Sequence, residues 1–126
     1  MKGPLVCVVE QRHEADCAIA ALAMLLCTSY EDALLAVGDP SVLQSGTWFT
    51  QIVHAAARFD VTLKRRKVWD HTLHEGIARI VRRKGRAHAV VIRRGLLFDT
   101  NGTVWDPPQY LSTDRSEFGV LLELVQ

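Results

Sequence analysis

The sequence predicts an α+β fold, because its two halves follow different patterns. The first half is rich in Ala and Leu at helical spacing, whereas the second half is β-branched, alternates in polarity and is punctuated by glycine. Helices first and antiparallel strands second are typical of an α+β domain. The chain has 126 residues, of which 48% are hydrophobic. We therefore expect a single domain over residues 1–126, with N-terminal helices packed on a C-terminal antiparallel sheet.

The helices are expected in the first half, after a short β-branched strand at residues 5–10. Residues 17–27 are apolar on every face, which predicts a helix enclosed by the rest of the fold. Acidic residues directly before this segment suit a helix N-terminus. Ser29 is a good cap for a second helix over residues 30–37, and a Gly-Asp-Pro sequence ends it. A third helix is expected over residues 47–58.

The strands are expected in the second half, where the period changes to two. The third, fourth and fifth of them form a meander, because Arg93-Arg94-Gly95 makes a tight connection and Asn101-Gly102 is typical of a hairpin turn. A short turn of helix is expected near residues 72–75. The last segment is predicted to be a closing strand, with a helix as the alternative. The strands are expected at residues 61–68, 77–82, 87–92, 96–100, 103–106 and 118–125.

Charge is distributed unevenly, although the net charge is only +1. Residues 58–94 hold twelve of the fifteen Lys and Arg but only three of the fourteen Asp and Glu. Basic residues in an alternating strand usually project to solvent, and the sequence has no known nucleic-acid-binding module, which argues against a nucleic-acid partner. The basic segment predicts instead an acidic substrate or an acidic partner protein.

The cysteines and the apolar segments indicate a cytoplasmic protein without a membrane partner. Three cysteines and no secretory signal are typical of free thiols in a reducing compartment. The longest apolar run has eleven residues, whereas a membrane span needs about 20. His71, His74 and Glu75 have the spacing of metal ligands, but no further ligand pair accompanies them. We therefore expect a polar turn there, and no metal or cofactor.

Cys17 and Gln11 are the first candidates for catalysis. Cys17 lies in the first turn of the buried helix, where backbone N–H groups and the helix dipole favour the thiolate. A buried structural cysteine is the alternative, and it is the preferred interpretation of Cys7 and Cys27. Gln11 precedes Cys17 by six residues, in the link to the helix. Its amide N–H is suited to stabilising an oxyanion beside the backbone N–H of Cys17.

Residues 11–25, QRHEADCAIAALAML, resemble the nucleophile motif of the double-glycine leader peptidases. In that motif a Gln precedes an acidic-Cys pair, which opens an Ala/Leu/Met helix. The resemblance implies a papain-like cysteine peptidase fold and a peptide or protein substrate. Members of the family cleave bacteriocin leader peptides and often form the N-terminus of an export transporter. The chain has Ala18 where the family usually has Gly, and it carries no transporter, so we expect a free-standing peptidase.

The resemblance also implies a His at the start of a strand, with an Asp or Asn on a neighbouring strand. His88 alone of the five histidines opens an apolar strand. A tight hairpin with Ile92 opposite Gly95 pairs His88 with Asp99, and opposed Cβ atoms lie about 5 Å apart. Asp106 stands in the Asp-Pro sequence that family members often carry, but its spacing does not match this hairpin. Asp99 is therefore preferred, and Asp106 stays the alternative, or a cap before a turn.

The predicted chemistry is hydrolysis of a peptide bond by a Cys-His-Asp triad. Cys17 attacks the carbonyl after His88 takes its proton, Asp99 orients His88, and Gln11 stabilises the oxyanion. The same residues serve isopeptidases, amidases and transglutaminases, because loops choose the leaving group and the acceptor. A non-catalytic protein-binding module that keeps the fold is a further alternative.

Overall fold

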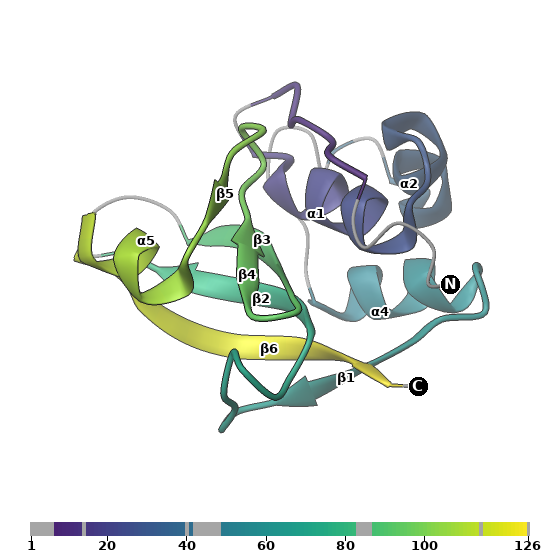
Figure 1. Ribbon diagram of the computed structural model, residues 1–126. Coiled ribbons are helices and arrows are strands. Elements are labelled where there is room, and N and C mark those ends of the chain that lie inside the picture. The colour runs from purple at the N-terminus through teal and green to yellow at the C-terminus, as the bar shows by residue number, and fades with distance from the viewer. Residues whose placement is uncertain are drawn as a thin grey trace, which may run out of the picture.

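The structure is a computed structural model, and it describes residues 7–13, 15–39, 41, 49–82, 87–113 and 115–125. The helices are α1 (Cys17–Leu26), α2 (Tyr30–Val37), α4 (Phe49–Ala57) and α5 (Pro107–Thr113). The strands are β1 (Thr62–Arg66), β2 (Gly76–Val81), β3 (His88–Arg93), β4 (Leu96–Phe98), β5 (Val104–Trp105) and β6 (Glu117–Val125). The predicted α+β architecture is confirmed (Figure 1).

The strands form one six-stranded antiparallel sheet in the order β1-β6-β2-β3-β4-β5. The predicted meander is confirmed, since β3, β4 and β5 are neighbours in both sequence and space. The predicted closing strand is also confirmed. It does not lie at an edge, because β6 pairs with β1 on one side and with β2 on the other.

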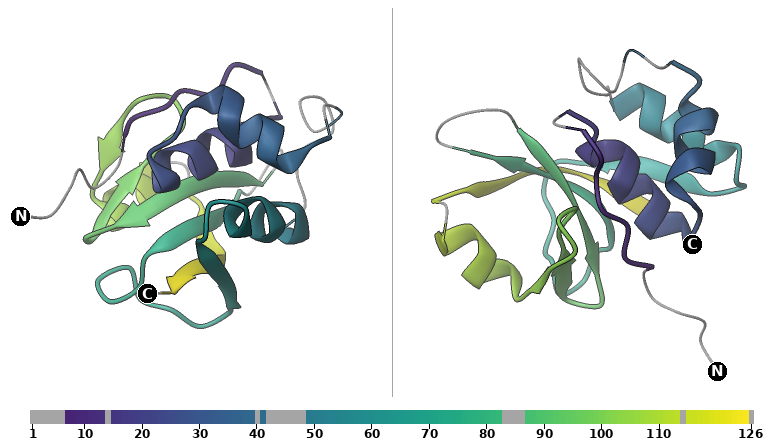
Figure 2. Two further views of the ribbon diagram at one scale, coloured as in Figure 1. Left: turned by 90° about the vertical axis from the view of Figure 1, so that its right-hand side faces the viewer. Right: turned by 90° about the horizontal axis from the view of Figure 1, so that it is seen from above.

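Hydrophobic side chains cover both faces of the sheet, as the alternation of its strands requires. Helices α1, α2 and α4 pack on one face, and α5 lies on the other face (Figures 1 and 2). The sheet residues of the first core are Leu63, Ile77, Ala89, Val91, Phe98 and Leu122. Those of the second core are Ala78, Ile80, Val90, Ile92, Leu97 and Leu121, which Tyr110 of α5 covers.

The helices begin and end for the reasons that their sequences suggested. In α1 every residue from Ile19 to Leu25 is buried, which explains the apolar character of all its faces. The Ser29 hydroxyl accepts a hydrogen bond from the backbone N–H of Asp32 at 3.0 Å and caps α2. Gly38, with φ of 80°, ends that helix. The predicted start of the third helix, residues 47–48, lies outside the described residues.

Two local predictions were wrong. Of the predicted strand at residues 5–10, residues 7–10 are described, and they have no regular secondary structure. This segment leads into the loop that carries Gln11, whose backbone N–H donates to the carbonyl of Thr100 at 2.9 Å. The turn predicted after Asp106, at Pro107 and Pro108, is instead the start of α5, because proline suits the first turn of a helix. Asp106 accepts the Gln109 N–H at 3.3 Å and caps that helix.

The segment between β1 and β2 is folded back as a turn. The carbonyl of Asp70 accepts the backbone N–H groups of Leu73 and His74 at 3.0 and 2.8 Å. This single turn stands where a short turn of helix was expected.

Within the part of the chain that is described, no single helix is long and apolar enough to cross a membrane. Helices α1 and α2 meet that test only as a pair, with a bend of 113° between them.

Candidate active site

Cys17 is the first residue of α1 and is half-buried. The first hydrogen bonds of the helix run from the N–H groups of Ile19 and Ala20 to the carbonyl of Asp16, at 3.0 and 3.2 Å. The N–H groups before them have no acceptor within the helix. The N–H of Ala18 and that of Ala89, in β3, interact with the Cys17 sulfur. The thiol therefore lies among backbone donors.

His88 joins this thiol to Asp99. It is the first residue of β3, and its Nε2 lies 2.7 Å from Oδ1 of Asp99. The His88 and Asp99 side chains are only 12% and 8% exposed. His88 also interacts with the Cys17 side chain, and this interaction shifts the pKa of both groups. Because Nε2 is engaged with Asp99, Nδ1 is the ring nitrogen left to exchange a proton with sulfur.

The hairpin register that was predicted to pair His88 with Asp99 was wrong. Ile92 lies opposite Leu97, not Gly95, because Arg94 and Gly95 form a two-residue turn with φ of 51° and 75°. The error is two residues, which is one full period of a strand. Asp99 therefore keeps the predicted face and meets His88 diagonally rather than directly.

The electrostatics of this pair favour a charged Cys17 and a charged His88. Burial opposes the thiolate, but the hydrogen bond and charge of His88, with the N–H groups of Ala89 and Ala18, lower the pKa of Cys17 below its ordinary value. Burial likewise opposes the imidazolium, but the hydrogen bonds to Asp99 and Cys17 raise the pKa of His88 to about 9. The arrangement therefore supports a thiolate–imidazolium pair near neutral pH.

Asp99 is buried and receives three hydrogen bonds. Its Oδ1 accepts the His88 ring N–H and the backbone N–H of Thr100, both at 2.7 Å, and its Oδ2 accepts the Tyr110 hydroxyl at 2.9 Å. Burial opposes ionisation, yet these donors together hold the pKa of Asp99 below its ordinary value. Burial and the neighbouring carboxylate raise the pKa of Tyr110 to about 12, so its hydroxyl stays a donor.

Asp106, the alternative acid, is exposed at the N-terminus of α5, where it serves as the cap. Among the described residues, Asp99 is the carboxylate in contact with His88. Tyr110 was not identified from the sequence. It lies in the helix that was mistaken for a turn, so its approach to Asp99 had no local signal.

Gln11 is connected to the His88–Asp99 pair by Thr100. Its Oε1 accepts the Thr100 hydroxyl at 2.5 Å, and its Nε2 donates to the carbonyl of His13 at 2.8 Å. A primary amide has two hydrogens, and the contact with His13 uses one of them. The structure thus brings all four predicted residues, Gln11, Cys17, His88 and Asp99, into one connected group.

Asp16 holds the loop that carries Gln11. It is fully buried, and its Oδ2 accepts the backbone N–H groups of Arg12 and His13 at 3.0 and 3.1 Å and the hydroxyl of Tyr30. The Arg12 guanidinium lies over the Tyr30 ring, 4.3 Å from its centroid. Asp16 therefore ties this loop to the start of α1 and to α2. Its acidic character had suggested only a favourable helix N-terminus.

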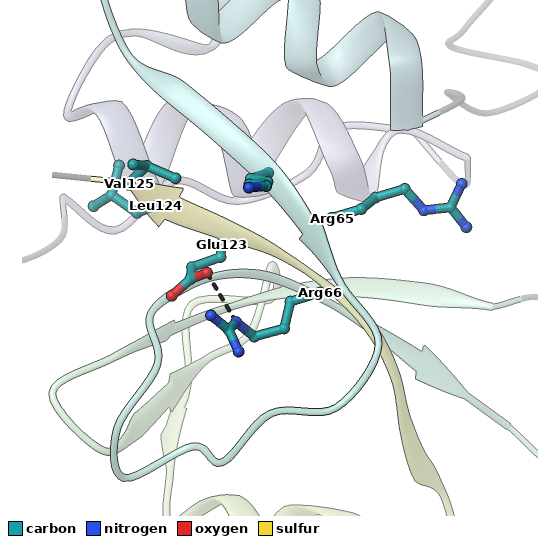
Figure 3. A pocket seen from close by; sticks show the side chains of 6 residues that line it. Arg65, Arg66, Glu123, Leu124 and Val125 are labelled. Carbon is teal, nitrogen blue, oxygen red and sulfur yellow. Dashed lines mark hydrogen bonds and ion pairs between the residues drawn. The ribbon is translucent and has the colours of Figure 1, made fainter.

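Three residues of the basic segment line a groove that lies away from this site (Figure 3). His88 lies level with the beginning of β6, because Ile80 pairs with both His88 and Phe118, whereas the groove lies at the end of β6. Its volume is about 490 Å³. The residues that line it are Lys64, Arg65 and Arg66 of the edge strand β1, and Glu123, Leu124 and Val125 of β6.

Among the described residues, the His71 and His74 pair does not belong to a larger ligand group. His74 Nδ1 accepts the backbone N–H of Asp70 at 3.0 Å. Within the described ranges, no three His, Cys, Asp or Glu side chains are grouped so that they could hold a metal ion.

No protein-family model matches the chain, and no curated protein matches its sequence. Its function is therefore inferred from the geometry of the site.

Proposed function

We propose that this chain is a papain-like cysteine peptidase with Cys17 as the nucleophile. The observation that carries the proposal is the continuous contact from Cys17 through His88 to the buried Asp99. A thiol at a helix start, against an imidazole at a strand start, is the arrangement that the resemblance to the double-glycine leader peptidases implies. That motif resemblance favours a peptide bond over the bonds that isopeptidases, amidases and transglutaminases attack.

In the proposed reaction, the Cys17 thiolate attacks the carbonyl carbon of the scissile bond, and the carbonyl oxygen becomes an oxyanion. The backbone N–H of Cys17 and an N–H of Gln11 stabilise that charge. The His88 imidazolium then gives its proton to the leaving amine, and an acyl-enzyme remains. A water molecule then attacks this thioester, and His88 takes a proton from the water molecule. Release of the acid restores the thiolate and the imidazolium.

Labelling with iodoacetamide near pH 6 tests the nucleophile. We expect Cys17 to label at least about tenfold faster than Cys27, since the contacts that lower the pKa of Cys17 raise its thiolate fraction at that pH. Cys27 is the more exposed of the two, so accessibility alone would give the opposite order. In His88→Ala the Cys17 rate should fall to about that of Cys27. Rates are read by mass spectrometry of the labelled peptides.

Cys7 provides an internal reference in the same samples. The Cys7 thiol donates to Cys27, and this contact, with some burial and the charge of Cys27, raises the pKa of Cys7 above its ordinary value, so it should label slowly. Equal labelling of Cys17 and Cys27 in the parent protein would refute the catalytic proposal.

We also propose that the groove at β1 and β6 binds an acidic segment of a substrate or partner. Its lining has three cations and one carboxylate, and that carboxylate is already paired, with Glu123 2.9 Å from the Arg66 guanidinium (Figure 3). Arg65 extends away from this pair, toward the Phe49 ring. The groove therefore has an excess of positive charge along an edge strand, which suits an extended acidic peptide.

Charge reversal tests this groove independently of catalysis. We expect Lys64→Glu to weaken binding of a fluorescent Glu-rich peptide about fivefold, measured by anisotropy, and added salt to weaken binding to the parent. Arg115→Glu is the control, because it makes the same change of charge at an exposed position outside the groove. Equal weakening by both variants would mean that only net charge matters, and binding that is independent of salt would remove the proposal.

A further inference from the structure

We infer that Thr100 is a positioning residue that links the oxyanion donor Gln11 to the His88–Asp99 pair. Thr100 has this role only if the chain is the proposed cysteine peptidase. Neither the motif nor the spacing of the sequence pointed to it.

Thr100 contacts three of the four proposed site residues. Asp99 comes directly after the end of β4, and Thr100 is the next residue. Thr100 is only 1% exposed. Its N–H donates to Asp99 Oδ1 at 2.7 Å, and its carbonyl accepts the Gln11 N–H at 2.9 Å. Its hydroxyl donates to Gln11 Oε1 at 2.5 Å and lies 3.4 Å from His88 Nε2. One buried residue therefore holds both the main chain and the side chain of Gln11.

The hydroxyl sets the orientation of the Gln11 amide. A hydroxyl has one hydrogen, and that hydrogen is donated to Gln11 Oε1. The amide nitrogen is thereby directed to the opposite side, where one hydrogen goes to the His13 carbonyl. Among the described residues, no acceptor is paired with the second hydrogen, so it can meet an oxyanion. Without the hydroxyl, a rotated amide would turn an oxygen toward the developing charge, and the stabilisation would be lost.

The same hydroxyl also fits the tautomer of His88. Since its hydrogen is used by Gln11, it faces His88 Nε2 only with lone pairs. A protonated Nε2, which donates to Asp99, matches that environment. The hydroxyl is therefore compatible with the ring form that leaves Nδ1 for Cys17, which the contact with Asp99 already sets.

A comparison of two reactions at Cys17 isolates this role. Hydrolysis of p-nitrophenyl acetate passes through an oxyanion, whereas alkylation by iodoacetamide displaces iodide and forms none. We expect Thr100→Val, which removes the hydroxyl but keeps the side-chain shape, to slow acyl transfer about 10- to 100-fold. Alkylation of Cys17 should change by less than about threefold. Thr100→Ser, which restores the hydroxyl, should keep both rates within about threefold of the parent.

A double variant shows whether Thr100 acts through Gln11. If it does, Gln11→Ala/Thr100→Val should be no slower in ester hydrolysis than Gln11→Ala alone, within about threefold. Losses that multiply, a Thr100→Val rate equal to the parent, or equal slowing of alkylation would each overturn the inference. If Thr100→Val does not fold, as judged by circular dichroism, Thr100→Ala takes its place. A parent without fast alkylation would instead remove the proposed function, and the role of Thr100 with it.

Discussion

The variant Asp99→Ala should hydrolyse a p-nitrophenyl ester about 10³-fold more slowly than the parent, because His88 loses the carboxylate that orients and stabilises it. Asp99 is buried and lies 2.7 Å from His88. Asp106→Ala should stay within about threefold of the parent. Asp106 only caps α5, so its loss should cost about 1 kcal/mol of folding free energy. The two variants therefore separate an effect on catalysis from an effect on stability.

The pH profile provides a second measure of the same contact. In the parent, the imidazolium persists until the pH passes the His88 pKa of about 9, so activity should fall above that pH. Without Asp99, His88 loses a contact that raises its pKa, while burial of the ring still lowers it. The pH above which activity falls should therefore move down, toward the ordinary histidine pKa of about 6.5. Comparable losses of activity in Asp99→Ala and Asp106→Ala would contradict the assignment of Asp99.

Gly76→Ala should unfold the protein or cost at least about 4 kcal/mol of folding free energy, which is a large part of the stability of most domains. Gly76 begins β2 with φ of 152°, a conformation that side chains rarely adopt. An added Cβ would lie 1.9 Å from the carbonyl oxygen of Leu122, in the neighbouring strand β6. Backbone atoms cannot move aside as a flexible side chain does. Guanidinium denaturation followed by circular dichroism measures the loss.

Gly95→Ala is the matched control for this effect. Gly95 has φ of 75° in the β3–β4 turn, but an added Cβ would meet no atom within 4 Å. Its cost should be about 1 kcal/mol, from the left-handed backbone alone. If both alanines cost the same, the contact with Leu122 has no part in the requirement for glycine.

The elements with a clear period or a clear cap could be predicted from the sequence. The apolar run after Cys17, the Ser29 cap and the alternating segments of the second half all became the expected helices and strands. The place of β6 in the sheet could not be predicted, because its pairing with β1 and β2 depends on contacts between residues that are distant in sequence. Helix α5 was missed because the two prolines were interpreted as a turn, although proline also suits a helix start.

The residues of the candidate site were predicted from their types and from the strand face on which they lie, not from the correct strand register. The predicted register of the β3–β4 hairpin differs by two residues from the register in the structure. Asp99 still lies on the same face as His88, because side chains along a strand repeat every two residues. Contacts made by buried polar side chains could not be anticipated. Thr100 and Tyr110 have ordinary local surroundings in the sequence, and only the fold brings them to Gln11 and Asp99.

The position of β6 has a consequence for synthesis on the ribosome. Chains are made from the N-terminus, so the helices and the β2–β3–β4–β5 meander leave the ribosome before the strand that joins β1 to β2. Cys17, His88 and Asp99 are all translated by then, but β1 still lacks a neighbour in the sheet. Contacts that are distant in sequence form slowly. We therefore expect the sheet to be completed only after β6 has been released from the ribosome.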